Sequence, residues 1–344
     1  MSLTKCLLSV DILPRVLAVT FSLLISTFAL AQRPEKATEV WLGGSNPLDA
    51  PRPGASTTPR TDFFEMFDLV GPWHRTAAGI QVMKFSPSLV LKANKATLSP
   101  IVADLNRSHI AIAVAFGWLC SPNDDLSCRV GIEGFAHSGS AGLFSKLIKA
   151  AGGDLKHVDI DEPLIFGHAY KGPQACNWII EQTAQNVAEG VGAIRAMFPN
   201  VQIGDTEPIG STDPTWPAQI SQWVAAYRAA TGTPLAFLHA DIQWSQNWQR
   251  QLGPMKSIAH QNHLPFGIIY DGVGKADIEW SHGAVARFEQ IEANPQWQPD
   301  TATIQSWEPF PSHMLPENKV GASTNLALRY LQEYKLTPGP DLAH

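Results

Sequence analysis

Residues 157–163 read HVDIDEP, a short strand pattern that ends in three carboxylates and a proline. Apolar and polar residues alternate, as they do along a β-strand, and Pro163 has no backbone N–H with which to continue a ladder. The pattern recurs in residues 201–208, VQIGDTEP, one predicted helix further along the chain. Two successive strands that end in carboxylates predict an acid-lined pocket at one end of a parallel sheet.

Outward from these two stretches, strand and helix patterns alternate along the chain. Ile110 to Leu119 is an almost continuous apolar run, typical of a strand buried on both faces. Ala184, Val187 and Val191 recur at helical spacing. The predicted strands are residues 39–43, 80–85, 110–119, 158–161, 201–205, 235–242, 266–270 and 303–307.

Each predicted strand is followed by a helical pattern, which makes eight strand–helix pairs. This alternation predicts right-handed crossovers and a parallel sheet. Eight pairs in about 310 residues favour a single (β/α)8 TIM-type barrel over residues 32–344. An open doubly wound sheet is the alternative, although no GxGxxG follows the first strand to suggest a dinucleotide site.

The amino terminus reads as a separate segment. Lys5 and Arg15 precede an apolar run from Val16 to Leu30, and residues 29–31 read ALA, a small-x-small cleavage pattern. A signal peptide over residues 1–31 and a secreted or periplasmic protein are therefore expected, with an uncleaved anchor as the alternative. The run is short for a membrane-spanning helix, and no stable membrane span is expected after cleavage.

The 344 residues include 16% charged side chains and carry a formal net charge of −6, without a run of Lys or Arg. This charge pattern does not favour a nucleic-acid partner. Three cysteines follow the predicted signal peptide, and an oxidising compartment would allow two of them to pair. Cys120 and Cys128 bracket a short loop, so a disulfide between them is expected because they are close in sequence. Cys176 could replace either partner. No CxxC or HxxxH spacing suggests a metal cluster.

Candidate site residues gather at the predicted carboxyl ends of the strands, where (β/α)8 barrels carry their catalytic groups. They are, in chain order, Lys84, Asp159, Asp161, Glu162, Asp205, Glu207, His239, Asp241, Asp271, Trp307 and Glu308. The opposite ends of the strands carry almost no charge. Crowded carboxylates raise one another's pKa, so at least one should hold its proton near neutral pH. Glycosidic bond hydrolysis uses such a pair, one protonated acid and one ionised carboxylate.

Asp161-Glu162-Pro163 resembles the Asn-Glu-Pro of the clan of retaining (β/α)8 glycoside hydrolases. The resemblance implies that Glu162 is the acid/base and that a second carboxylate ends the seventh strand. Residues 269–272 read IYDG there, so Asp271 is the candidate, one methylene shorter than the clan's glutamate. Trp307 is similar to the clan's sugar-platform tryptophan.

Glu207, which stands in its own Glu-Pro tip, is the other candidate for the second carboxylate. Asp161, Asp205, His168, Asp241, Trp307 and Lys84 complete the site as substrate-binding residues. Lys84 could instead only neutralise the acids, and His168 could belong to a plain loop. Glu133, in the loop after the third strand, either enters the site or caps the next helix.

The sequence therefore predicts a secreted glycoside hydrolase-like barrel that acts on a polysaccharide or oligosaccharide without a cofactor or metal. Two other functions remain open. Asp161, Asp205 and Asp241 could hold Mg2+ or Ca2+ through oxygen ligands in a metal-dependent barrel enzyme. A non-catalytic carbohydrate-binding or envelope barrel would keep the fold without a working carboxylate pair.

Overall fold

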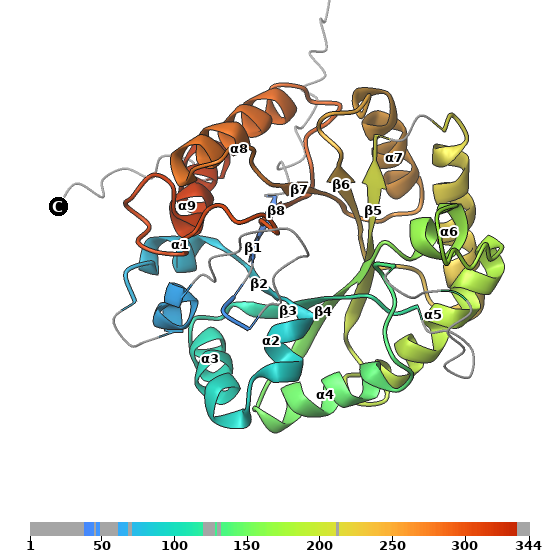
Figure 1. The fold of residues 1–344 in the computed structure, drawn as a ribbon, viewed down its shortest axis with the longest axis horizontal. Helices are drawn as coiled ribbons and strands as arrows, with labels where there is room; N and C mark the ends of the chain where they lie inside the picture. The colour runs from blue at the N-terminus through green and yellow to red at the C-terminus, as the bar shows by residue number, and fades with distance from the viewer. Residues whose placement is uncertain are drawn as a thin grey trace, which may run out of the picture. The chain divides into compact units, whose positions relative to one another are not determined.

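Eight parallel strands close into a barrel in the computed structural model, and the helices lie around its outside (Figure 1). The structure describes residues 38–44, 46–48, 61–67, 71–119, 128, 132–210 and 213–335. The strands are Glu39–Gly43 (β1), Val82–Phe85 (β2), Ala111–Phe116 (β3), Leu155–Asp161 (β4), Gln202–Ile209 (β5), Leu238–Ile242 (β6), Phe266–Tyr270 (β7) and Thr301–Ile304 (β8).

The α-helices that alternate with the strands are His74–Gly79 (α1), Pro87–Lys92 (α2), Lys95–Arg107 (α3), Ser140–Ala150 (α4), Ile180–Arg195 (α5), Trp216–Thr231 (α6), Gln249–Gln261 (α7), Asp277–Glu292 (α8) and Ser323–Tyr334 (α9). A 3-10 helix, Thr61–Phe67 (η1), follows β1, and a single π-helical turn, Ile165–Ala169 (η3), follows β4.

Strand pairing confirms the predicted (β/α)8 barrel and excludes the open sheet. β1 pairs in parallel with both β2 and β8, so the sheet has no edge. The predicted bounds of β1 and β7 agree with the structure, whereas β5 continues through Pro208 to Ile209, four residues beyond its predicted end. The proposed signal peptide, residues 1–31, lies outside the described residues and stays a prediction.

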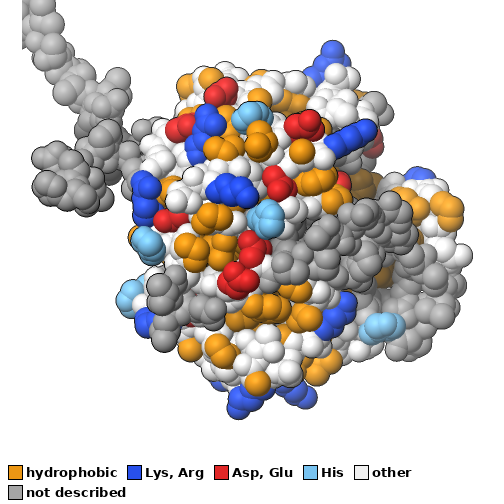
Figure 2. Space-filling model, turned by 60° about the vertical axis from the view of Figure 1, so that its left-hand side comes forward, with side chains coloured by type: hydrophobic (Ala, Val, Ile, Leu, Met, Phe, Trp, Pro, Cys, Tyr) orange, Lys and Arg blue, Asp and Glu red, His pale blue; other side chains and the backbone are white. Residues whose placement is uncertain are grey.

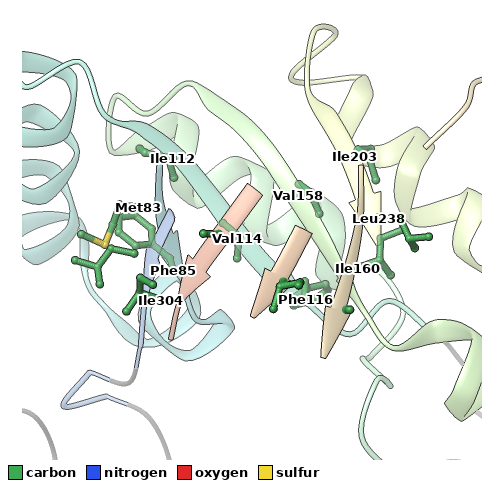
Figure 3. Close-up of a cluster of buried hydrophobic side chains, with 14 of the residues drawn as sticks. Met83, Phe85, Ile112, Val114, Phe116, Val158, Ile160, Ile203, Leu238 and Ile304 are labelled. Atoms are coloured by element: carbon green, nitrogen blue, oxygen red, sulfur yellow. The ribbon is translucent and has the colours of Figure 1, made fainter. Parts of the chain in front are cut away.

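Apolar side chains on the outer face of the sheet form the main core. Val158 and Ile160 of β4 and Ile203 of β5 point toward the helices, together with the side chains labelled in Figure 3. Each of these three residues is at most 1% exposed, as expected for strands that pack under helices.

Aromatic rings fill the inside of the barrel below the carboxyl ends of the strands. Trp41 contacts His157, Phe237 and His239 at ring-centroid distances of 5.0, 5.2 and 5.0 Å. Gly204 is required beside them, because a Cβ there would lie 2.2 Å from the Phe237 ring. This layer closes the barrel from below, so any cavity must lie toward the carboxyl ends of the strands.

A disulfide joins Cys128, in the loop after β3, to Cys176, in the loop after β4. The predicted Cys120–Cys128 bond is therefore wrong, and Cys120 itself lies outside the described residues. Proximity in sequence favoured the shorter loop, but the barrel brings the loops of neighbouring strands together and leaves the Cα atoms of Cys128 and Cys176 5.0 Å apart. A disulfide is typical of proteins in an oxidising compartment.

Two further observations concern the outside of the molecule. Acidic and basic side chains are interspersed with apolar ones on the face shown in Figure 2. None of the helices in the described residues is long and apolar enough to cross a membrane.

Candidate active site

A cavity of about 280 Å³ opens at the carboxyl ends of the strands, and every strand of the barrel or the residue that follows it contributes to its wall. Four carboxylates and one lysine are among the lining residues. The lining consists of Gly44, Lys84, Phe85, Ser86, Pro87, Ala115, Glu133, Asp161, Glu162, Thr206, Asp241, Ile269, Gln305, Ser306 and Trp307.

The end of β4 turns Glu162 into this cavity. Asp161 is the last strand residue, and Glu162 departs from the strand with a φ of 53°. Glu162 donates its backbone N–H to the Thr206 carbonyl oxygen at 2.9 Å. Its own carbonyl oxygen accepts from the backbone N–H of Phe166 at 3.1 Å. A positive φ is uncommon for a residue with a side chain, and such conformations occur frequently at active sites. Strand alternation alone would have pointed Glu162 outward.

The carboxyl group of Glu162 lies in an environment that favours its protonated form. Burial raises its pKa well above the ordinary value, and the charges of Asp161, Asp241, Glu133 and Asp205 raise it further. Both effects favour the protonated form of Glu162, which is the form in which a carboxyl group can act as a general acid.

Asp241, on the inner face of β6, is the second cavity carboxylate with a displaced pKa. Burial raises its pKa to about 7, with further contributions from Asp271 and Asp161, whereas the charge of Lys84 lowers it. The cavity thus contains one carboxyl group, Glu162, whose protonated form is favoured, and a second, Asp241, whose pKa is about 7. Such a pair can supply an acid and a base to the same bond.

Lys84 and Asp159 form a buried ion pair below the cavity. The Lys84 Nζ donates to Asp159 Oδ2 at 2.6 Å, and Thr206 Oγ1 donates to Asp159 Oδ1 at 2.7 Å. Burial would raise the pKa of Asp159, but the charge of Lys84 and the nearby ring of His239, whose Nδ1 lies 3.8 Å from Asp159 Oδ2, outweigh it and hold the pKa well below its usual range. Lys84 both neutralises an acid and lines the cavity.

The carboxylates of β5 lie outside the cavity lining. Ile203, Asp205 and Glu207 alternate with Thr206, which lines the cavity, so they share the face of β5 that points toward the helices. Asp205 Oδ2 accepts from the indole Nε1 of Trp223 at 2.6 Å. Glu207 is fully buried and accepts from the backbone N–H of Leu164 at 2.6 Å through Oε1, and of Ile165 at 3.2 Å through Oε2. Glu207 thus supports the turn that follows Glu162.

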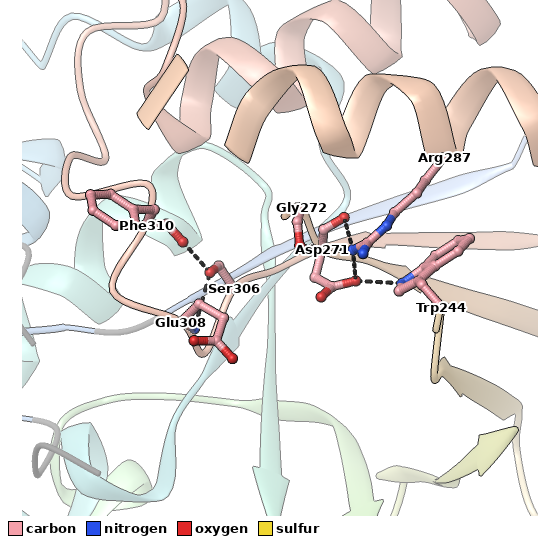
Figure 4. Close-up of polar contacts among 7 residues, drawn as sticks. All are labelled: Trp244, Asp271, Gly272, Arg287, Ser306, Glu308 and Phe310. Carbon is pink, nitrogen blue, oxygen red and sulfur yellow. Dashed lines mark hydrogen bonds and ion pairs between the residues drawn. The ribbon is translucent and has the colours of Figure 1, made fainter. Parts of the chain in front are cut away.

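Asp271, at the end of β7, is held by two side chains (Figure 4). Its Oδ1 accepts from Arg287 Nη1 at 2.7 Å and from Trp244 Nε1 at 2.6 Å. The guanidinium also lies over the Trp244 ring, 4.6 Å from its centroid. Burial raises the pKa of Asp271 although Arg287 opposes the shift. Asp271 is 8% exposed and is not among the residues that line the cavity.

His168 also lies outside the lining, in η3, where its Nδ1 is 2.6 Å from the Trp178 carbonyl oxygen. Trp307 lines the cavity beside Ser306, whose Oγ accepts from the backbone N–H of Glu308 and donates to the Phe310 carbonyl oxygen (Figure 4). Glu133 lies on the exposed rim of the cavity, so it enters the site.

Sequence reasoning did not find Thr206, Gln305, Ser306 or Ser86 among the lining residues. Each is a polar residue on the inner face of a strand end or directly after one, and that position was the available signal. Within the described part of the chain, no group of three or more His, Cys, Asp or Glu side chains is arranged to hold a metal ion. The metal-dependent alternative therefore has no ligand set in these residues.

Solved barrels align with most of the chain. GH5_18 from Streptomyces cattleya, solved in complex with GlcNAc, aligns at a TM-score of 0.52 and 12% identity, over 88% of this chain and 83% of its own. A GH10 endoxylanase from a sugarcane soil metagenome aligns at 0.52 and 9%, over 87% and 98%. An endo-1,4-beta-xylanase from Caldicellulosiruptor owensensis aligns at 0.50 and 8%, over 81% and 87%.

At these identities the comparison shows the fold alone. No protein-family model matches the sequence, and no curated protein matches it significantly. The chain is thus a TIM barrel, a fold that it shares with these glycoside hydrolases.

Proposed function

We propose that this protein hydrolyses a glycosidic bond, with Glu162 as the proton donor and Asp241 as the second carboxylate. The observation that carries the proposal is that both carboxyl groups line one cavity at the carboxyl ends of the barrel strands. Burial and neighbouring carboxylates raise the pKa of each. Trp307 on the cavity wall offers an indole face against which a sugar ring can pack.

The chemistry needs no group beyond these residues and water. Glu162 transfers its proton to the glycosidic oxygen while the bond from that oxygen to the anomeric carbon breaks. Asp241 then either bonds to the anomeric carbon or accepts a proton from the water that attacks it. In the first case water releases the sugar from Asp241, and Glu162 takes up the proton from that water. Both routes consume one water. The route through a bond to Asp241 returns both carboxyl groups directly to their starting states. In the other route Asp241 ends protonated and Glu162 ionised, and proton exchange with the solvent restores them before the next turnover.

Three substitutions test the assignment against a panel of aryl glycosides and polysaccharides. Glu162→Gln should lower kcat about 10²–10⁴-fold on natural linkages, because protonation of a poor leaving group is lost. The loss should be much smaller on dinitrophenyl glycosides, whose leaving group needs no proton. Asp241→Asn should lower the rate on both substrate types. Glu289→Gln, on the exposed side of α8, is the matched control and should leave activity unchanged.

Proton NMR of the first product identifies the part that Asp241 takes. Retention of the anomeric configuration indicates bonding to Asp241, and inversion indicates a water activated by it. Equal turnover by wild type and Glu162→Gln on an unactivated glycoside would remove Glu162 from the mechanism.

One observation favours a second function, a non-catalytic carbohydrate-binding barrel. Asp271, the acid at the end of β7, accepts hydrogen bonds from Arg287 and Trp244 and does not line the cavity. The glycoside hydrolase resemblance implies a cavity carboxylate at this strand. A protein that binds oligosaccharides in calorimetry yet releases no product from any member of the panel would have this function. The disulfide supports the further proposal that the protein acts outside the cytoplasm, as a secreted or periplasmic protein.

A further inference from the structure

The floor of the cavity is built across four strands. Lys84 projects inward from β2 and reaches Asp159 on β4, although β3 lies between these two strands. It can do so because the inner face of β3 carries only methyl groups there, those of Ala113 and Ala115. Thr206 of β5 holds the other oxygen of Asp159. These contacts fix the ammonium group at one place under the cavity.

Stability alone does not account for this ion pair. Lys84 is 5% exposed and Asp159 is 1% exposed, so both charges have lost most of their hydration. A buried ion pair is often no more stabilising than apolar side chains of similar volume. The pair differs from an ordinary structural one in that Lys84 also lines the cavity, where it is the one cation among the described lining residues.

The charges around the two proposed catalytic carboxyl groups differ in one respect. Glu162 is acted on chiefly by four other carboxylates. The groups that face Asp241 are Asp161 from β4, Asp271 from β7, Glu133 from the loop after β3, and the cation Lys84 from β2. Arg287 of α8 also interacts with the charge of Asp241, but it is ion-paired with Asp271. Lys84 therefore acts on Asp241 from below, in a site where burial and neighbouring carboxylates otherwise favour the protonated forms of Glu162 and Asp241.

We propose that Lys84 is a positioning residue for this site, and that its ammonium group, fixed by Asp159 below the cavity, keeps Asp241 as the ionised member of the pair while Glu162 holds the proton. The catalytic role of Lys84 in this inference rests on the proposed function. The effect of Lys84 on the titration of Asp241 does not, and it can be measured without a substrate.

The test compares neutral replacements of the pair. Lys84→Gln with Asp159→Asn removes both charges, allows an amide hydrogen bond in their place, and avoids leaving a single buried charge. Lys84→Met with Asp159→Asn is a second neutral pair, in case the first does not fold. Lys84→Arg keeps the cation. The matched control is Lys156→Met with Asp154→Asn, an exposed Lys–Asp pair at the start of β4.

Carbon-13 NMR titration of the Asp241 carboxyl group is the deciding measurement. In either neutral pair the pKa of Asp241 should rise by up to about one pH unit. The lost cation, Lys84, lines the cavity with Asp241 and favours its ionised form, whereas the lost anion, Asp159, lies below the cavity and offsets only part of this effect. The acidic limb of the pH–rate profile should move upward by the same amount. Lys84→Arg and the control pair should titrate like wild type. An unchanged pKa of Asp241 in a folded neutral pair would overturn the inference.

The two proposals fail in different ways. The titration needs no substrate, so it decides the role of Lys84 even if no glycoside is cleaved. Conversely, normal turnover in Glu162→Gln would overturn the proposed function and leave the titration of Asp241 unaffected.

Discussion

The neighbouring strands β4 and β5 each have a Glu-Pro dipeptide at or near the carboxyl end, but the two glutamates lie in different surroundings. β4 ends at Asp161, so Glu162 leaves the strand with a positive φ and enters the cavity. β5 continues through Glu207 and Pro208, so Glu207 keeps the strand alternation and points away from the cavity. Its two oxygens accept the backbone N–H groups of the turn after Glu162. A dipeptide at a strand end therefore does not define a role; the residue at which the strand ends does.

The two glutamates are also connected, because one supports the segment in which the other lies. Glu207 holds Leu164 and Ile165, directly after Glu162-Pro163. The two roles can be distinguished experimentally. Substitutions that weaken the contacts around the end of β4 should lower stability, whereas substitution of Glu162 should lower turnover.

The largest expected effect on stability comes from the covalent link beyond the end of β4. Cys128 and Cys176 are 48 residues apart in sequence, and closing a loop of that length stabilises the folded state by about 4 kcal/mol in the chain-entropy model. Cys128→Ala with Cys176→Ala should lower the free energy of unfolding by that order, as measured by urea denaturation. The link joins two loops at the cavity mouth, so KM should rise more than kcat falls.

Cys120→Ser is the control for this variant, since it should preserve the Cys128–Cys176 bond and the stability of the wild type. A double alanine variant as stable as wild type would show that the two loops are held by their other contacts.

A smaller effect is expected from Glu207→Gln. The amide has one acceptor oxygen where the carboxyl group has two, so one of the backbone N–H groups of the turn loses its partner. A buried donor left without a partner costs about 1–3 kcal/mol. The variant should therefore be less stable than wild type in urea denaturation, while Glu162→Gln keeps wild-type stability and loses turnover. The reverse pattern, a stable Glu207→Gln protein without activity, would place Glu207 in the chemistry.

The smallest expected effect concerns Asp205, the other acid of β5. It is a change in how the free energy of unfolding depends on pH. Burial raises the pKa of Asp205 well above its ordinary value, more than the hydrogen bond from Trp223 lowers it. A carboxyl group whose pKa is raised on folding stabilises the folded state fully below its unfolded pKa, and that contribution is lost as pH rises through its folded pKa. Asp205→Asn stays neutral and can still accept from Trp223.

The unfolding free energy of Asp205→Asn should consequently fall less than that of wild type between pH 5 and pH 8, by the order of 1 kcal/mol. Urea denaturation at both pH values measures this difference. Asp154→Asn, at an exposed position, should follow the wild-type curve. Parallel curves for Asp205→Asn and wild type would mean that Asp205 does not hold its proton in the folded protein.

Much of the fold could be predicted, because each strand is an apolar run of its own and each helix has its own periodicity. All eight strands, and α3 to α9 in their order, followed from these local patterns. The short helices α1 and α2 were not predicted, since six residues offer too few turns for a helical period to be recognised. Boundaries were less certain wherever a polar residue continues a strand, as Thr206 and Glu207 do in β5.

The candidate site was predictable only at the level of which strand ends carry acids. Alternation showed that Asp205 and Glu207 share a face, but not whether that face meets the cavity or the helices. The answer depends on partners distant in sequence, the indole of Trp223 and the backbone of Leu164 and Ile165. Glu162 entered the cavity against the alternation because of a single backbone angle, which no period in the sequence encodes.

The positive φ of Glu162 affects which substitutions at this position would stabilise the protein. A residue with a side chain is disfavoured in the left-handed region by roughly 1–2 kcal/mol, and a glycine would adopt the same conformation without that penalty. Selection for thermal stability alone would therefore favour Glu162→Gly, and the variant would gain stability as it lost the proposed proton donor. Resistance to unfolding and retention of the proposed proton donor therefore make opposite demands on position 162.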